Sequence, residues 1–275
     1  MNAITGLYVP GDRPDRFAKA VATGADLVVL DLEDAVAPDR KAFAREAVVS
    51  WLAETTARCV LQVRVNDGDR DDLAALRGLT GFEVRLPKVE SPDRVDEVVA
   101  ALPGVPVTAL VESALGVEHA ALIAGHPAVT RLGLGESDLA SELGTDAEPV
   151  LDHARVRLLY AARAAGLPAP MLSVHPAIAD LAGLRADTER GRRLGWVGRM
   201  AVHPSQLPVI AEVFRPSEAE RRWADEVLAA VGAGGVATLA NGEMVDPAML
   251  GRARAILDRE AKSSPDTSAR VRGGR

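Results

Sequence analysis

Short apolar runs alternate with longer mixed stretches along most of the chain. The runs show little polar alternation, which is typical of strands buried on both faces of a parallel sheet. The stretches between them have the apolar periodicity of amphipathic helices. The pattern predicts eight strands: Ile4–Val9, Leu27–Leu30, Cys59–Val65, Glu83–Leu86, Val107–Val111, Arg131–Leu134, Met171–Val174 and Arg199–Val202.

Helical segments are expected between and after these strands. Eight regular strand–helix units in a chain of 275 residues match the size of one (β/α)8 TIM barrel. A doubly wound open sheet is the alternative, and the regularity of the units favours closure. The main predicted helices are Arg13–Thr23, Arg40–Leu52, Arg70–Arg77, Pro92–Ala101, Glu148–Ala165, Ile178–Leu194 and Gln206–Val213.

Beyond the barrel, the pattern predicts two more helices, Arg215–Val231 and Ala248–Lys262, joined by the flexible Gly- and Ala-rich linker Gly232–Gly242. The last residues are polar and basic without an apolar cluster, which is typical of a disordered tail. The chain is therefore expected to divide into a catalytic barrel, a C-terminal helical extension with a lid, and a tail: residues 1–214, 215–262 and 263–275.

Composition limits the function classes. The net charge of −7 argues against a nucleic-acid binder, which needs a basic face. No apolar run approaches the length of a membrane span, and the first residues lack a signal-peptide pattern. The single cysteine, Cys59, lies in an apolar run and leaves no disulfide framework or cysteine-based metal site. A soluble cytoplasmic protein is the expectation.

Polar residues stand where the predicted strands stop. In a parallel barrel all of these positions meet on one rim, the carboxyl ends of the strands, where such barrels keep their chemistry. Each residue alone can be a cap or turn residue, but a whole ring of them favours a site. The residues are Asp31, Arg64, Lys88, Glu112, Asp138, His175 and His203.

Glu112 and Asp138 are the strongest candidates within this ring. They lie 26 residues apart, about one strand–helix repeat, and so at the ends of neighbouring strands. Two converging carboxylates suit Mg²⁺, which keeps several waters. Arg64 and Lys88 add positive charge for an anionic substrate, although they can also pair with rim acids. Substrate contacts are expected from these two and from the turn before Asp138, formed by Gly135, Glu136 and Ser137.

Several motifs also carry a resemblance to the citrate lyase β-subunit family, part of the HpcH/HpaI aldolase superfamily. The order and spacing of these motifs are similar to those of the family from about Gly6 to Asp246, which is nearly the whole chain. The motifs are LYVPGDRPDRFAKA, LVVLDLEDAV, LPKVES, LVESALG, GESDL and AVHPSQL.

The resemblance implies a (β/α)8 barrel that is usually trimeric and uses Mg²⁺ with acyl-thioester substrates. It matches Glu112 and Asp138 to metal ligands and Arg64 to the arginine that binds the substrate carboxylate. Asp34 matches an acid near the metal, acting through water. Asp246 falls in a C-terminal lid motif whose aspartate reaches a neighbouring subunit's site.

Two departures from the family pattern affect the expected substrate. Ser137 stands where family members often have Glu directly before the metal-binding Asp, and Ala177 stands where an acid is common. The loop after the seventh strand is therefore expected to differ, which leaves the substrate more open than the chemistry.

The expected reaction is Mg²⁺-dependent retro-Claisen cleavage of a malyl-, citramalyl- or citryl-type CoA thioester into a keto acid and an acyl-CoA. Arg64 would hold a carboxylate through its two-pronged guanidinium, and Asp246 would protonate the enolate from a closing lid. Asp246 can equally be a helix N-cap before Pro247. A thioesterase, a condensing enzyme and a citrate lyase subunit docked to an acyl-carrier protein remain alternatives.

Three basic residues recur every three positions near the first helix: Arg13, Arg16 and Lys19. Residues at that spacing share a helix face, which could bind CoA phosphates. A solvated face balanced by Asp12 and Asp15 is the other interpretation. The linker is also long enough to reach a neighbouring subunit, so a homo-oligomer is expected. With the trimer that the resemblance implies, each site would be completed by Asp246 of a neighbour.

Overall fold

The computed structural model describes residues 3–232 and 235–263. The stretch predicted as a disordered tail, 263–275, lies outside the described residues apart from Ser263. Contacts within the chain divide it into two compact units, Met1–Val213 and Phe214–Arg275. No helix in the described part of the chain is both long and apolar enough to cross a membrane.

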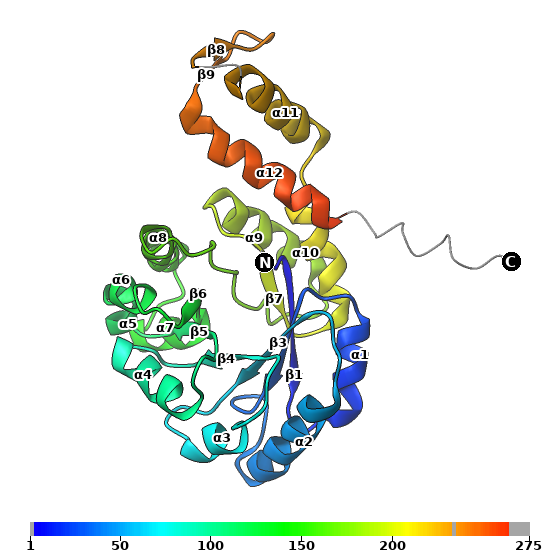
Figure 1. The fold of residues 1–275 in the computed structure, drawn as a ribbon, viewed down its shortest axis with the longest axis vertical. Coiled ribbons are helices and arrows are strands. Elements are labelled where there is room, and N and C mark those ends of the chain that lie inside the picture. The colour runs from blue at the N-terminus through cyan, green and yellow to red at the C-terminus, as the bar shows by residue number, and fades with distance from the viewer. Residues whose placement is uncertain (1–2, 233–234, 264–275) are drawn as a thin grey trace, which may run out of the picture. The chain divides into compact units, whose positions relative to one another are not determined.

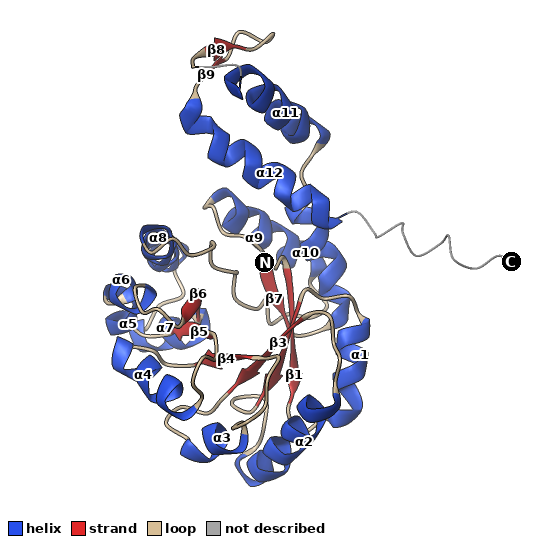
Figure 2. Ribbon diagram, in the orientation of Figure 1, coloured by secondary structure: helices blue, strands red, loops and turns tan. Residues whose placement is uncertain are grey.

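The first unit is built on a seven-stranded parallel sheet with helices around it (Figures 1 and 2). The strands lie in the order β6-β5-β4-β3-β2-β1-β7. Their apolar residues, such as Val28, Val63 and Val107, are fully buried, as the continuous runs predicted. The strands are β1 Thr5–Pro10, β2 Leu27–Asp31, β3 Val60–Arg64, β4 Glu83–Leu86, β5 Val107–Val111, β6 Val129–Leu134 and β7 Arg199–Ala201.

Two single bridges close the sheet into a barrel. Met171 pairs with Gly133 of β6, and Leu172 pairs with Arg199 of β7, both in parallel orientation. These two residues take the place of the predicted strand Met171–Val174, which is wrong as a regular strand. Pro170, directly before them, lacks the N–H that a longer ladder would need. The open-sheet alternative is excluded, because the ring is complete.

Helices follow the strands as expected, with some changes in extent. The predicted helix Arg13–Thr23 is split into a short 3-10 helix, Pro14–Arg16, and α1. The segment after β5 forms two short helices, and the predicted Gly-Glu-Ser turn is instead the start of helix α7. The helices are α1 Phe17–Ala22, α2 Lys41–Glu54, α3 Arg70–Ala75, α4 Pro92–Ala101, α5 Ala114–Glu118, α6 Ala120–Ala124, α7 Glu136–Leu143, α8 Glu148–Ala164, α9 Leu181–Arg193 and α10 Leu207–Phe214.

The second unit consists of two helices, α11 Glu218–Gly232 and α12 Leu250–Ser263, with a small hairpin between them. The hairpin pairs β8, Ala237–Thr238, with antiparallel β9, Met244–Val245. Its turn contains Asn241 and Gly242, a pair that favours tight turns, and Leu239 is buried with the helix side chains. The prediction of a free linker over Gly232–Gly242 is therefore wrong for its described part.

Candidate active site

The carboxyl ends of the strands surround a cavity of about 330 Å³. The in-register pairing of Asp31 with Arg64 places both strand ends on the same rim. Of the residues predicted for the site, those that line the cavity are Asp31, Asp34, Arg64, Glu112, Gly135, Glu136, Ser137 and Asp138.

Glu112 and Asp138 form the carboxylate pair that the sequence predicted. Glu112 follows β5 and is only 5% exposed, whereas Asp138 lies in the first turn of α7 and is exposed. Burial raises the pKa of Glu112 to about 8, and the hydrogen bond to Asp138 and the charge of Glu33 act in the same direction. Without a cation, the two carboxyl groups share a proton. A cation bound between them would stabilise the charged forms of both Glu112 and Asp138.

Gly135 provides the room for this pair. A Cβ atom at this position would lie 2.5 Å from the Glu112 Cγ and 2.9 Å from its Oε2. The backbone N–H of Gly135 also donates to the Val111 carbonyl at 2.8 Å, which fixes the glycine beside the end of β5. Any side chain here would push the Glu112 carboxylate out of its place.

The donor set fits Mg²⁺. Mg²⁺ is commonly held by one or two carboxylates and keeps several waters. Within residues 3–232 and 235–263, no three His, Cys, Asp or Glu side chains are close enough to form a protein-only metal cage. Glu112 and Asp138 would therefore hold the ion, with water or substrate oxygens as the other ligands.

Arg64 is the centre of an acidic cluster at the ends of β2 and β3. Its Nε donates to Asp31 Oδ1 at 2.7 Å and its Nη2 donates to Asp31 Oδ2 at 2.6 Å. Its Nη1 contacts Asp34 Oδ2 at 2.9 Å and Glu33 Oε2 at 3.0 Å. Burial opposes its charge, but the bonds to Asp31 outweigh this and raise the pKa of Arg64. The guanidinium is permanently charged and rigidly held.

This geometry limits which edge of the Arg64 guanidinium can hold a substrate carboxylate. The edge formed by Nε and Nη2 is occupied by Asp31, which is 1% exposed, and is not available to a substrate. Only the edge formed by Nη1 and Nη2 can meet a substrate carboxylate. Asp34 and Glu33 both contact that edge through Nη1. The 65% exposed side chain of Asp34 can move away, whereas Glu33 is buried and stays beside Nη1.

Lys88 lies beside the cavity and links two of the acids. Its Nζ is 3.4 Å from Glu33 Oε1, and its backbone N–H donates to Glu112 Oε1 at 3.3 Å. Among the described residues it is the only non-glycine with a positive φ, at 53°. Such a conformation is unfavourable for lysine and is often found at functional sites.

Glu136 and Ser137 begin α7 at the cavity wall. Both carboxylate oxygens of Glu136 accept hydrogen bonds from the buried Arg155 of α8, one of them from Nε at 2.9 Å. Glu136 therefore joins α7 to α8. Ser137 is exposed at the cavity. Arg155 was missed from the sequence because its partner lies 19 residues away and on another helix.

Of the other predicted residues, Arg13, Arg16 and Lys19 do not line this cavity. Arg13 donates through Nε to Asp15 at 3.0 Å, as the charge-balance interpretation predicted, and Arg16 and Lys19 are exposed. Asp246 belongs to the second unit, where its Oδ1 accepts from the Ala248 N–H at 2.9 Å as a helix N-cap.

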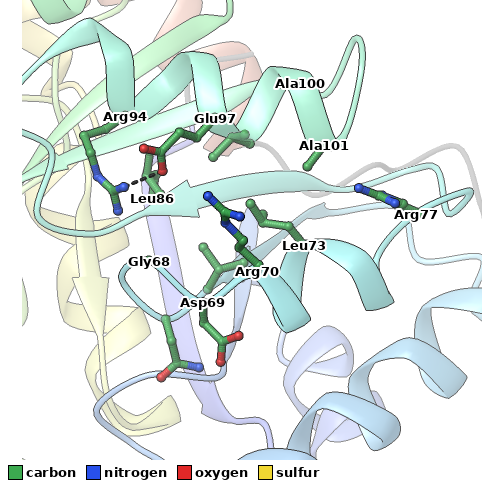
Figure 3. Close-up of a pocket in the computed structure, with 13 residues that line it drawn as sticks. Gly68, Asp69, Arg70, Leu73, Arg77, Leu86, Arg94, Glu97, Ala100 and Ala101 are labelled. Atoms are coloured by element: carbon green, nitrogen blue, oxygen red, sulfur yellow. Dashed lines mark hydrogen bonds and ion pairs between the residues drawn. The ribbon is translucent and has the colours of Figure 1, made fainter.

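A second cavity, of about 350 Å³, lies between α3 and α4. Arg70 of α3 and Arg94 of α4 point into it, and Arg94 also contacts Glu97 (Figure 3). None of the residues predicted for the site line it. The carboxylate pair, and with it the candidate chemistry, belongs to the cavity at the strand ends.

Sequence comparison decides the family. The family model of the HpcH/HpaI aldolase/citrate lyase proteins matches residues 4–204. The chain belongs to this family. The matched region covers every strand of the barrel, so the predicted family and the predicted (β/α)8 fold are both confirmed.

Known members share most of their length with this HpcH/HpaI family chain. A (3S)-malyl-CoA thioesterase of Cereibacter sphaeroides is 40% identical over 232 residues, covering 82% of this chain and 81% of the relative. An L-malyl-CoA/β-methylmalyl-CoA lyase of the same organism is 33% identical over 294 residues, covering 91% and 92%. The crystal structure of CitE from Mycobacterium tuberculosis with magnesium, acetoacetate and coenzyme A has a TM-score of 0.82 at 36% identity, covering 94% and 98%.

These relatives define the class of enzyme. The thioesterase and the lyase are named for reactions of CoA thioesters, and the CitE structure contains magnesium and coenzyme A. The chain is thus an enzyme of a family that contains both lyases and thioesterases of CoA substrates.

Proposed function

We propose that this protein is a Mg²⁺-dependent lyase that cleaves a β-hydroxyacyl-CoA thioester into a keto acid and an acyl-CoA. The observation that carries the proposal is the Glu112–Asp138 pair, which shares a hydrogen bond in the cavity that Arg64 also lines. A metal-binding acid pair and a fixed cation in one cavity suit a substrate with a carboxylate beside its hydroxyl.

Different side chains have different roles in the proposed reaction. Mg²⁺, when bound by Glu112 and Asp138, would lower the pKa of the substrate hydroxyl and polarise the forming carbonyl. Arg64 binds the adjacent carboxylate through its Nη1 and Nη2 edge and stays oriented because Asp31 holds the other edge. Asp34, displaced from Arg64 by that carboxylate, orients a water that takes up the proton released by the substrate hydroxyl.

Cleavage leaves an acyl-thioester enolate that must take up a proton. Asp246 is the proposed donor, from a homotrimer in which the lid of one subunit completes the site of the next. Its place in a separate compact unit with a defined hairpin supports a preformed lid in place of a free linker. Arg13, Arg16 and Lys19 remain the proposed contacts for the CoA phosphates.

A thioesterase is the second candidate, because a relative at 40% identity carries that name. It would add water to the same thioester and release free CoA and the hydroxy acid, with no carbon–carbon bond broken. A subunit that works only with an acyl-carrier protein is the third, and it would leave free CoA thioesters untouched.

One experiment distinguishes the lyase, the thioesterase and the carrier-protein subunit. Purified protein is incubated with Mg²⁺ and a panel of malyl-, citramalyl- and citryl-CoA, and the products are identified by mass spectrometry. A lyase gives an acyl-CoA and a keto acid in equal amounts, whereas a thioesterase gives free CoA. EDTA should abolish turnover reversibly, and turnover that persists in excess chelator would exclude the metal-dependent mechanism.

A further inference from the structure

A second buried arginine lines the same cavity, and the chemistry above does not use it. Arg85 lies on β4, and its side chain points into the barrel below the rim. The residue is only 4% exposed, yet it lines the cavity together with Arg64 and Glu112. No sequence pattern singled it out, because it lies within β4 and not at the end of the strand.

The charge of Arg85 has no acidic partner within the described residues. Its Nη1 donates to the neutral Gln62 Oε1 at 3.2 Å, and its guanidinium carbon lies 5.5 Å from the ring centre of Tyr8. Its Nε has no hydrogen-bond partner in the described part of the chain. Arg64, by contrast, contacts three carboxylates. A buried cation without an anion is costly.

The surroundings of Arg85 are shaped to hold it. Gly133 of β6 makes room for it, since a Cβ there would lie 3.2 Å from Nη2. Gln62 is oriented because its Nε2 donates to Glu83 and to Thr108, each at 2.8 Å. Those bonds turn the Gln62 carbonyl toward Arg85 and keep the Glu83 carboxylate on the other side of the amide.

We propose that Arg85 forms a second anion subsite, which binds a second free carboxylate of the substrate. The inference rests on the proposed function and names its substrate class. The carboxylate next to the hydroxyl goes to Arg64, and a carboxymethyl group on the same carbon extends to Arg85. The preferred substrate is then a hydroxyacyl thioester with two free carboxylates, and its keto-acid product is a dicarboxylate.

Two thioesters test the subsite, because they differ at one group. Citryl-CoA carries a carboxymethyl group where citramalyl-CoA carries a methyl group. The wild type should prefer citryl-CoA in kcat/KM by roughly 10- to 100-fold, the value of one charge-assisted hydrogen bond. Arg85→Met, similar in length but neutral, should remove most of that preference and change kcat/KM for citramalyl-CoA by less than about threefold. Equal losses for both substrates would mean a structural role and overturn the proposal.

Product binding keeps this test independent of turnover and of the variant's folding. In the presence of Mg²⁺, the wild type should bind oxaloacetate roughly 10-fold or more tightly than pyruvate by calorimetry. Equal affinities would overturn the subsite even if Arg85→Met fails to fold. If neither thioester is cleaved but oxaloacetate is preferred, the proposed reaction fails and the subsite stands.

Discussion

Glu112 is a buried acid whose charged form is disfavoured until a cation arrives. Its pKa of about 8 lies above the ordinary 4.5, so the folded protein without metal retains a proton that the unfolded chain releases. The preference of the folded state for protonated Glu112 contributes to the free energy of unfolding. This contribution is fully present below pH 4.5 and is lost as the pH rises through about 8.

Glu112→Gln should therefore be more stable than the wild type in EDTA, by an amount that grows from about pH 5.5 to about pH 9. Urea denaturation at both pH values measures the difference. Mg²⁺ should raise the stability of the wild type but not of the variant. Glu118→Gln, an exposed change on α5, serves as the control without such a trend. A difference that does not vary with pH would show that Glu112 is not protonated in the metal-free protein.

Gly135 tests the shape of the metal site without removing a ligand. Gly135→Ala would place a Cβ 2.5 Å from the Glu112 Cγ, so Mg²⁺ affinity should fall about 10-fold or more and activity with it. Calorimetric titration with Mg²⁺ gives the affinity. Gly125→Ala is the matched control, because its Cβ would meet the nearest atoms at an ordinary 3.5 Å. Unchanged Mg²⁺ binding in the first variant would place the metal elsewhere.

At the level of elements, the ends of β2 and β3 are joined by the Asp31–Arg64 pair. The two residues are register partners in neighbouring parallel strands, so the sheet itself brings them together. The bonds made by Nε and Nη2 hold the guanidinium plane and leave one edge toward the cavity. Strand pairing thus orients the group that meets the substrate.

Arg64→Lys should lower kcat/KM about 100-fold, because one ammonium cannot bond both Asp31 oxygens and a substrate carboxylate. Steady-state kinetics and urea denaturation are measured together. Arg45→Lys is the matched control, since Arg45 also joins two acids, Asp69 and Asp72, but outside the cavity. Both variants should lose about 1–3 kcal/mol of stability, and only the first should lose activity. Near wild-type kinetics for Arg64→Lys would reduce Arg64 to a structural residue.

At the level of the whole molecule, the chain combines a barrel with a separate helical unit that carries Asp246. Asp246 caps the short 3-10 helix Pro247–Met249, directly before α12, through the Ala248 N–H. Asparagine caps helices as well as aspartate does, but it cannot donate the proton that the enolate needs. The two roles can therefore be separated by a single substitution.

Asp246→Asn should fold normally and lose activity, and exchange with inactive Glu112→Ala subunits should restore about a quarter of the sites in a closed ring. Light scattering measures the oligomer, and a mass-tagged subunit confirms exchange. Subunits that carry both substitutions should restore nothing when mixed with Asp246→Asn. Full activity of Asp246→Asn alone would leave Asp246 as a helix cap only.

The sequence by itself determined the parts that depend on local pattern and strand direction. Apolar runs specified seven of the eight predicted strands, and their polar ends predicted Glu112, Asp138 and Arg64 for the site, because parallel strands all end on one rim. Its error over Gly232–Gly242 was also local, since the turn signal of Asn241 and Gly242 was present.

Only the tertiary structure decided which side chains share a bond. The closure through Met171 and Leu172, the second arginine in the cavity and the pairing of Glu136 with Arg155 all join residues far apart in the chain. A sequence pattern predicts on which face of a helix or strand a residue lies and where that helix or strand ends. The distance between two such faces is set by packing of the whole barrel, and hydrogen bonds and pKa values depend on that distance.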